Sequence, residues 1–264
     1  MSDGGWKARL MTPVQVVATL LLFAESIAIL GAALFPALAL LGWAEARLSP
    51  AGALRSLGLA VAIAAGWFAF GFALLVVLPV ARWVTFSFGT PVGRFPYFSA
   101  GAWRWASYNA LTLMLRFTFV NWIRVTPLLP LYHRLMGARI GRRVQINTAV
   151  IADQNLVQIG DDSVIGGDVT LICHSAEGGH LVTAPVSIGR GVTVGLMAVV
   201  FPGCVIGDGA VISAGSVLSK GTKVGPGEIW AGVPARRVGR RRPRTGRAPP
   251  PLRTKAQPDE AGPE

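Results

Sequence analysis

The stretch ICHSAEGGHLVTAPVSIG, from Ile172 to Gly189, gathers most of the side chains in this chain that could do chemistry. It holds two of the three histidines, His174 and His180, next to Cys173. An imidazole titrates near neutral pH and can serve as a general base or a metal ligand, and an ionised thiol can serve as a nucleophile. His174 is therefore a candidate base, a candidate ligand or an ordinary loop residue.

A metal site needs more ligands than this stretch supplies. Catalytic zinc sites use about three protein ligands. The third histidine, His133, lies upstream in an apolar segment, and Cys173 and Cys204 form no CxxC pair. We therefore expect no bound metal and two reduced thiols, with Cys204 in a core position. His133 is expected to be an interfacial or packing residue.

The elements that position His174 follow from a period of six. An aliphatic residue recurs at every sixth place without a slip, at Ile188, Val194, Val200, Ile206, Ile212, Leu218 and Val224. This period fits neither a helix nor a two-sided strand, but it fits a triangular parallel β-helix, in which each hexad makes one face and its corner. The same spacing of six residues occurs at Ile159, Ile165 and Leu171, and more weakly at Ile140 and Ile146.

The repeat is interrupted at the histidines. Leu171 and Ile188 are 17 residues apart, one short of three hexads. The intervening residues are therefore predicted to leave the prism wall as a loop, and loops on rigid scaffolds are where sites are usually built.

The chain as a whole is too apolar for an ordinary soluble protein, so part of it should lie in a membrane. Of 264 residues, 52% are hydrophobic and only 14% are charged, and the mean hydropathy is +0.51. Stretches at about 13–43 and 56–81 each exceed the roughly 20 apolar residues that cross a bilayer. We predict a membrane region at 1–104 with two transmembrane helices, the first tilted or broken near Gly31 and Pro36. That first stretch is longer than a signal-peptide core, so we expect a retained anchor.

Charged residues indicate the orientation in the membrane. The loop between the spans holds Arg47 and Arg55 against Glu45, whereas 82–124 carries five arginines and no acid. The positive-inside rule then places the β-helix in the cytoplasm, beneath a bacterial inner membrane. Glu25 lies inside the first span, where it is either a neutral hydrogen-bonded group or a functional one.

Residues 105–137 mix Trp, Tyr and Arg into apolar runs, with Arg116 in the middle. This composition is typical of a helix that lies in the membrane interface, with its arginines reaching the headgroups. We predict an interfacial helix and linker here, with a third span at 105–123 as the alternative.

The C-terminal residues 239–264 are rich in Pro and Arg and nearly lack bulky apolar side chains. Such a segment cannot bury a core, so we predict a disordered tail whose arginines contact anionic lipid. Eight of the arginines lie within 236–253, and not on a folded face with interleaved aromatics. We therefore expect no nucleic-acid partner.

These motifs resemble a known family, the hexapeptide-repeat acyltransferases, especially maltose/galactoside and exopolysaccharide O-acetyltransferases. The resemblance covers 131–238 and rests on the hexads, on His174 with the later PVSIG, and on the ending AGSVLSK…AGVPARRV. It implies a fold of N-terminal transmembrane helices followed by a left-handed parallel β-helix, a triangular prism at 138–238. The two spans are also similar to the membrane-bound C-terminal region of polylysine-synthetase-like nonribosomal peptide synthetases.

The resemblance implies roles for individual residues. His174 matches the general base, and the backbone amide of Leu196, after Gly195, matches the oxyanion donor. Asn155 and Thr193 match positions near the acceptor, although Thr193 replaces an aromatic residue. The thioester of acetyl-CoA or another acyl-CoA, used as co-substrate, would lie near Ala214, Gly215, Ser219, Lys220, Arg236 and Arg237.

Three functions remain open on these grounds. The first is acyl transfer from a CoA thioester to a hydroxyl or amine of a lipid-linked or envelope acceptor, by a homotrimer with its sites between prisms. The second is amide formation from the pantetheine thioester of a carrier protein. The third is a non-catalytic trimeric membrane scaffold, for which an intact His174 loop would be unnecessary. Cys173 is a further, weaker candidate as a nucleophile.

Overall fold

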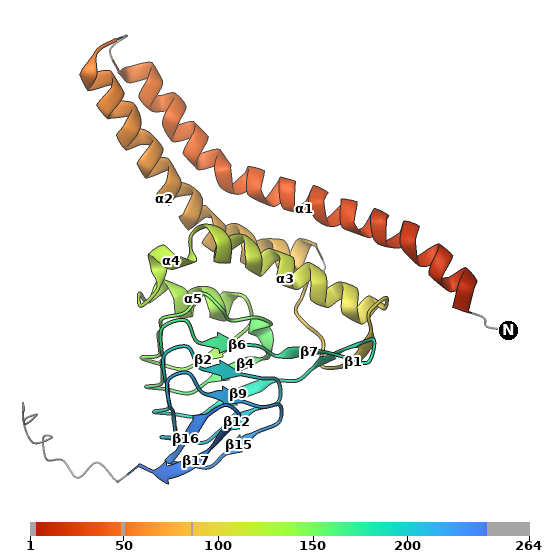
Figure 1. Cartoon of the computed structure of the whole chain (residues 1–264). Coiled ribbons are helices and arrows are strands. Elements are labelled where there is room, and N and C mark those ends of the chain that lie inside the picture. The colour runs from red at the N-terminus through yellow and green to blue at the C-terminus, as the bar shows by residue number, and fades with distance from the viewer. Residues whose placement is uncertain (1–3, 49–50, 86, 242–264) are drawn as a thin grey trace, which may run out of the picture.

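The computed structural model describes residues 4–48, 51–85 and 87–241, and it combines a helical half with a β-prism (Figure 1). The long helices α1 (Gly4–Arg47) and α2 (Ala53–Val84) form a hairpin beside one end of the prism. Both predicted spans lie inside these helices. Helix α1 is continuous through Gly31 and Pro36, and it changes direction along its length without a break in the helix (Figure 1).

The hairpin is apolar on nearly all sides. Two of its segments are long and apolar enough to cross a membrane, Pro13–Arg47 with a mean hydropathy of 2.2 and Ala53–Val84 with 2.5. Their large apolar side chains are widely exposed, as in a surface that meets lipid and not water. These features weakly suggest membrane association. The Glu25 Oε1 atom is buried here with no hydrogen-bond partner among the described residues, and its role stays a prediction.

Helix α3 (Ala100–Thr118) lies across the near end of the prism, followed by α4 (Val120–Ile123) and α5 (Leu128–Leu135) (Figure 1). Its first turn is capped by the Ser99 hydroxyl, which accepts a hydrogen bond from the Ala102 amide at 3.3 Å. One face buries Tyr108 and Leu111, while Phe117 on another face is 75% exposed. Such an amphipathic helix fits the interfacial prediction better than a third span.

The prism consists of short parallel strands on three faces. One sheet has the order β17-β16-β13-β10-β5-β3, the second β14-β11-β6 and the third β15-β12-β9-β4-β2; all pairs are parallel except β16 with β17. The bounds are β2 (Arg139–Ile140), β3 (Gln145–Ile146), β4 (Val157–Ile159), β5 (Val164–Ile165), β6 (Thr170–Leu171), β9 (Val186–Ile188), β10 (Thr193–Val194), β11 (Val199–Val200), β12 (Val205–Ile206), β13 (Val211–Ile212), β14 (Val217–Leu218), β15 (Lys223–Val224), β16 (Glu228–Gly232) and β17 (Ala235–Arg240).

The predicted left-handed parallel β-helix is confirmed, and its hexads account for the core. The aliphatic residues at every sixth place, from Ile188 to Val224, are each at most 4% exposed. Every turn of the prism stacks these side chains on those of the turn below, so burial is continuous along its axis. Strand β17 extends to Arg240, two residues into the predicted tail, and 242–264 lie outside the described residues.

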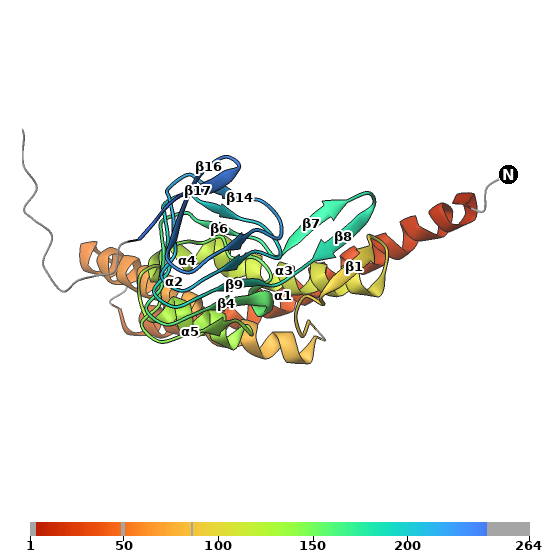
Figure 2. The same cartoon turned by 90° about the horizontal axis from the view of Figure 1, so that it is seen from below.

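The predicted excursion after Leu171 is a β-hairpin that projects from the prism (Figure 2). It is formed by β7 (His174–Glu177) and β8 (His180–Thr183), joined by Gly178 and Gly179 with φ of 51° and 77°. Positive φ at both turn residues matches the twist of a two-residue hairpin. Strand β1 (Gly93–Pro96), which precedes α3, pairs antiparallel with β8. The hairpin is therefore tied to the helical half.

Candidate active site

His174 lies where the chain leaves the prism, as the first residue of β7. Its Nδ1 atom is 2.6 Å from the Oδ2 atom of Asp153. The Asp153 side chain is fully buried, whereas that of His174 is 27% exposed. One imidazole nitrogen is therefore held from the inside of the protein, and the ring remains accessible from outside.

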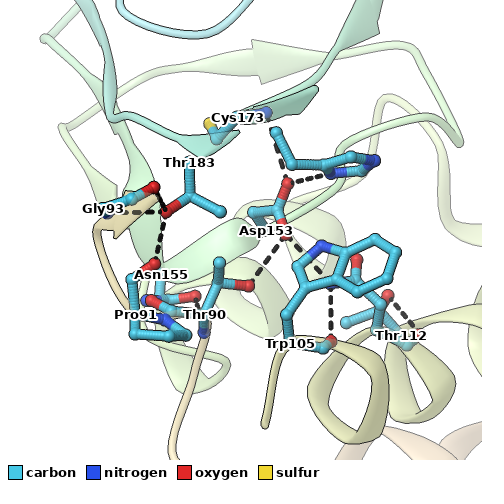
Figure 3. Close-up of polar contacts among 11 residues, drawn as sticks. Thr90, Pro91, Gly93, Trp105, Thr112, Asp153, Asn155, Cys173 and Thr183 are labelled. Atoms are coloured by element: carbon cyan, nitrogen blue, oxygen red, sulfur yellow. Dashed lines mark hydrogen bonds and ion pairs between the residues drawn. The ribbon is translucent and has the colours of Figure 1, made fainter. Parts of the chain in front are cut away.

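Asp153 is fixed by donors from three parts of the chain (Figure 3). Its Oδ1 atom accepts from the Thr90 hydroxyl at 2.8 Å and from the Asn109 side-chain amide at 2.9 Å, and Oδ2 also accepts from the Cys173 backbone amide at 3.3 Å. Asp153 has a φ of 55° and precedes the short 3₁₀ helix η1 (Gln154–Leu156). Aspartate tolerates this left-handed conformation better than most residues. The carboxylate orientation is thus determined before any ligand binds.

Electrostatics at this carboxylate favour the ionised form. Burial alone would raise the pKa of Asp153, but the hydrogen bond and charge of His174 and the hydrogen bonds from Asn109 and Thr90 lower it below its usual range. An ionised carboxylate only accepts hydrogen bonds, so Nδ1 of His174 must carry a proton. In the neutral form of the ring, the other nitrogen, Nε2, carries the lone pair that a general base requires.

Trp105 of α3 forms one wall beside the imidazole. The centroids of its ring and that of His174 are 4.9 Å apart, with the planes at 67° in an edge-on contact. Edge-on pairs of aromatic rings are favourable and limit ring rotation. The helical half therefore contributes directly to the position of His174.

Asn155 supports this arrangement from behind. Its side-chain Nδ2 donates to the Thr90 carbonyl and its Oδ1 accepts from the Thr90 amide, both at 2.9 Å. Thr90 in turn donates to Asp153, so Asn155 acts on His174 through two intermediates. A contact between Asn155 and the acceptor stays a prediction.

The predicted oxyanion residues lie on a different corner of the prism. Gly195 and Leu196 follow β10, and the Leu196 carbonyl accepts from the Gly215 amide at 2.8 Å on the next turn. The Leu196 amide donates to no acceptor in the part of the chain that the structure describes, and its side chain is 53% exposed. Thr193 lies on β10 itself. Within one chain, no described hydrogen bond, ion pair or ring contact joins this corner to His174.

The predicted CoA residues fall into separate groups. Ala214 and Gly215 are next to Leu196, Ser219 and Lys220 follow β14, and Arg236 and Arg237 lie on β17. Lys220 forms an ion pair with Glu177 of the β7–β8 hairpin, and Arg237 pairs with Glu228 at 3.3 Å. The first pair brings Lys220 to the strand that carries His174. Anion binding by these side chains stays a prediction.

Cys173 is poorly suited to nucleophilic catalysis. It is fully buried, and burial, followed by the charge of Asp153, raises the pKa of its thiol. The protonated thiol is a weak nucleophile. Cys204 is buried too, in the predicted core position. Among the described residues, no group of three or more His, Cys, Asp or Glu could hold a metal ion.

Replacing Cys173 with alanine is expected to leave acyl transfer within about twofold of wild type, because only its backbone amide contacts Asp153. The missing sulfur leaves a small cavity, so stability should fall by about 1 kcal/mol. The measurements are the transfer rate and the thermal midpoint. A loss of activity comparable to that of a His174 variant would show that the thiol reacts.

His133 has the packing role expected of it. It is 4% exposed on α5, and desolvation lowers its pKa to about 4, with a smaller opposing effect from Gln154. It is therefore neutral at physiological pH. At the hairpin turn, Nδ1 of His180 is placed to donate to the Gly178 carbonyl at 2.9 Å, its one side-chain hydrogen bond among the described residues.

Four residues of this site were missed by sequence reasoning: Thr90, Trp105, Asn109 and Asp153. A signal existed for Asp153 alone. Ile146 and Ile159 are 13 residues apart, one more than two hexads, so the register slips there as it does at His174. The other three lie in the N-terminal half, where no repeat gives them a position.

Comparisons with known proteins give a match to the repeat. Residues 185–220 match a family model described as the hexapeptide repeat of succinyl-transferase. A Delta-poly-L-ornithine synthetase of Acinetobacter baumannii (strain AB307-0294) is 30% identical over 151 residues, which are 57% of this chain but only 11% of that relative's length.

Similar solved structures are acetyltransferases. A galactoside acetyltransferase in complex with coenzyme A is 23% identical over 56% of this chain and 86% of its own, with a TM-score of 0.45. A maltose O-acetyltransferase from Clostridium difficile 630 is 25% identical over 40% of this chain and 60% of its own, with a TM-score of 0.37. No residue role is transferred from them. The matched repeat confirms the resemblance stated above for 185–220, and it supports an acyltransferase.

Proposed function

We propose that this chain is a membrane-anchored acyltransferase that moves an acetyl or other acyl group from a CoA thioester to a hydroxyl or amine. The observation that carries the proposal is the Asp153–His174 pair, with Nδ1 held at 2.6 Å and Nε2 left as a proton acceptor. The acceptor we propose is lipid-linked or part of the envelope, because the site adjoins an apolar helical half. A scaffold would not require a buried carboxylate aligned by three further donors.

The reaction conserves atoms and charge with these groups. His174 Nε2 takes the proton of the acceptor hydroxyl or amine. At the same time the oxygen or nitrogen of the acceptor forms a bond to the thioester carbonyl carbon. The resulting oxyanion accepts a hydrogen bond from a fixed backbone amide, for which the Leu196 N–H is suited. The carbon–sulfur bond then breaks, and the imidazolium returns its proton to the CoA thiolate.

A homotrimer would complete the site. His174 and Leu196 lie on different corners of one prism, so the amide of a neighbouring copy is the natural partner for the base. Exposed apolar side chains on the prism support such packing: Val164, Leu196, Met197 and Val205 are 36–62% exposed. The same proposal places two membrane helices in a bacterial inner membrane, with the prism in the cytoplasm.

Replacing Gly195 with alanine is expected to lower kcat at least about tenfold with little change in the KM for acyl-CoA, since one oxyanion donor contributes about 10²–10³ in kcat. A Cβ atom at this position would lie 2.5 Å from the Ala214 amide nitrogen, so the backbone that carries the Leu196 amide must move.

Gly207→Ala is the matched control. Its Cβ atom would lie 2.7 Å from the Pro226 nitrogen, which is similar crowding at a corner remote from Leu196. Equal losses of kcat in both variants, with equal thermal midpoints, would remove the oxyanion role from Leu196.

The donor is tested with the full chain in detergent or vesicles. Acetyl-CoA is compared with acetyl-pantetheine at equal concentration, and thiol release is followed with wild type and with Lys220→Ala. We expect acetyl-CoA to be used at least ten times more efficiently, with that advantage reduced by Lys220→Ala. Thiol release that stays unchanged in His174→Ala would contradict the proposal.

A second candidate is amide formation from a carrier-protein thioester. The 30% identity to a Delta-poly-L-ornithine synthetase favours it, although the match covers 11% of that relative. It predicts indifference to the nucleotide of CoA, so equal use of acetyl-CoA and acetyl-pantetheine would favour this reading.

A further inference from the structure

An apolar groove of about 780 Å³ lies between the N-terminal part of α1 and the start of α3. Its α1 wall includes Val14, Val17 and Leu21, which are 57–62% exposed. The facing wall includes Phe98 and Trp103. The volume is within the range of ligand sites, about 300–1,000 Å³. None of the described residues that line the groove is charged.

The groove and the candidate active site share one residue. Trp105 lines the groove, and the same indole lies edge-on to the His174 ring at 4.9 Å. Leu181 of β8, on the hairpin that carries His174, lines it as well. A molecule that fills the groove therefore approaches the base from the α3 side.

The Trp105 indole also presents an unused polar group. Its Nε1 atom is buried and has no hydrogen-bond partner among the described residues. Buried indole N–H groups usually find an acceptor.

The aromatic side chains around the groove are typical of a membrane interface. Tyr97, Phe98 and Trp103 are 38–58% exposed around the groove. Aromatic side chains of this kind collect where headgroups meet acyl chains. The opposite wall belongs to α1, whose segment Pro13–Arg47 is apolar enough to cross a bilayer.

We propose that this groove holds the hydrocarbon chain of the acyl acceptor and presents its hydroxyl or amine to His174. The role of this ligand as the acyl acceptor rests on the proposed function. A CoA nucleotide does not suit the groove, because none of the described side chains that line it can pair with phosphates. The residues predicted for CoA on β17 lie at the other end of the prism, away from α3 (Figure 1).

The test uses the full chain in vesicles of phosphatidylethanolamine and phosphatidylglycerol, with a 16-carbon primary alcohol that carries a photoreactive diazirine. We expect adducts at 13–21 and 97–106, displaced by hexadecanol at least ten times better than by hexanol. Ala18→Phe, which fills the groove, should reduce them at least fivefold. Ala24→Phe is the matched control on the exposed α1 surface outside the groove and should leave them unchanged.

Three outcomes would overturn the proposal. They are equal labelling along all lipid-facing parts of α1 and α2, labelling that Ala18→Phe does not reduce, and displacement by palmitoyl-CoA in preference to hexadecanol. The last would assign the chain to the acyl donor. His174→Ala should keep full labelling of the groove. The proposed catalysis is tested separately, because acyl transfer that survives in His174→Ala would contradict it.

Discussion

Replacing His174 with alanine is expected to lower the rate of acyl transfer by about 10²–10⁴-fold, the usual contribution of a positioned general base. The reason is that the Asp153 contact occupies Nδ1 and leaves the lone pair of Nε2 in the neutral ring available at this site. The KM for acyl-CoA should change little, because the predicted CoA residues lie on other turns of the prism. Steady-state kinetics of the full chain in detergent measure both quantities.

His180→Ala is the control within the same hairpin. Its Nδ1 atom interacts only with the Gly178 carbonyl, and it should retain wild-type kinetics. Both variants should keep the wild-type thermal midpoint within a few degrees. If His180→Ala lost as much activity as His174→Ala, the hairpin as a whole and not the base would be responsible.

The second large effect is expected from Asp153→Asn, which should lower kcat by about 10²–10⁴-fold with the imidazole still present. An amide can turn an N–H towards His174 and favour the tautomer with the proton on Nε2. Its oxygen and nitrogen also cannot both accept, so either Nδ1 of His174 or the donors Thr90 and Asn109 lose a partner. Asp153 is thus a positioning residue.

The pH dependence of stability is a separate expectation for Asp153. The pKa of Asp153 is lowered in the folded state, so its charge stabilises the fold above the unfolded value near about 3.9, and this stability is lost as pH falls through the folded value. Asp153→Asn should lack that acid-dependent loss.

Asp208→Asn is the matched control for a carboxylate at a prism corner. Asp208 accepts from the Arg190 amide at 2.8 Å and is exposed, so its replacement should not alter kcat. A normal kcat in Asp153→Asn would show that the carboxylate does not act through His174.

The repeat was the most informative part of the sequence because each inward position has the same burial requirement. Positions such as Val194 and Ile212 could be assigned to the core from spacing alone, and both are fully buried. The break at Leu171 likewise located the hairpin and His174. Hexad spacing works because every turn of the prism repeats one local geometry.

The contacts across the two halves were not predictable in this way. Pairing of β1 with β8 and the contact of Trp105 with His174 join residues far apart in sequence, and no period links them. Asn155 was expected near the acceptor, but its side chain binds the backbone of Thr90. A polar residue beside a site has the same sequence signature whether it contacts the substrate or supports a neighbour.

The most direct test of the central claim is mass spectrometry of lipid extracts and envelope glycans from membranes supplied with isotopically labelled acetyl-CoA. Membranes containing the wild-type chain are compared with membranes containing His174→Ala. The account predicts that one species gains a labelled acyl increment only with wild type. Identical profiles, with both proteins folded and membrane-bound, would contradict the assignment of His174 as the base for acyl transfer.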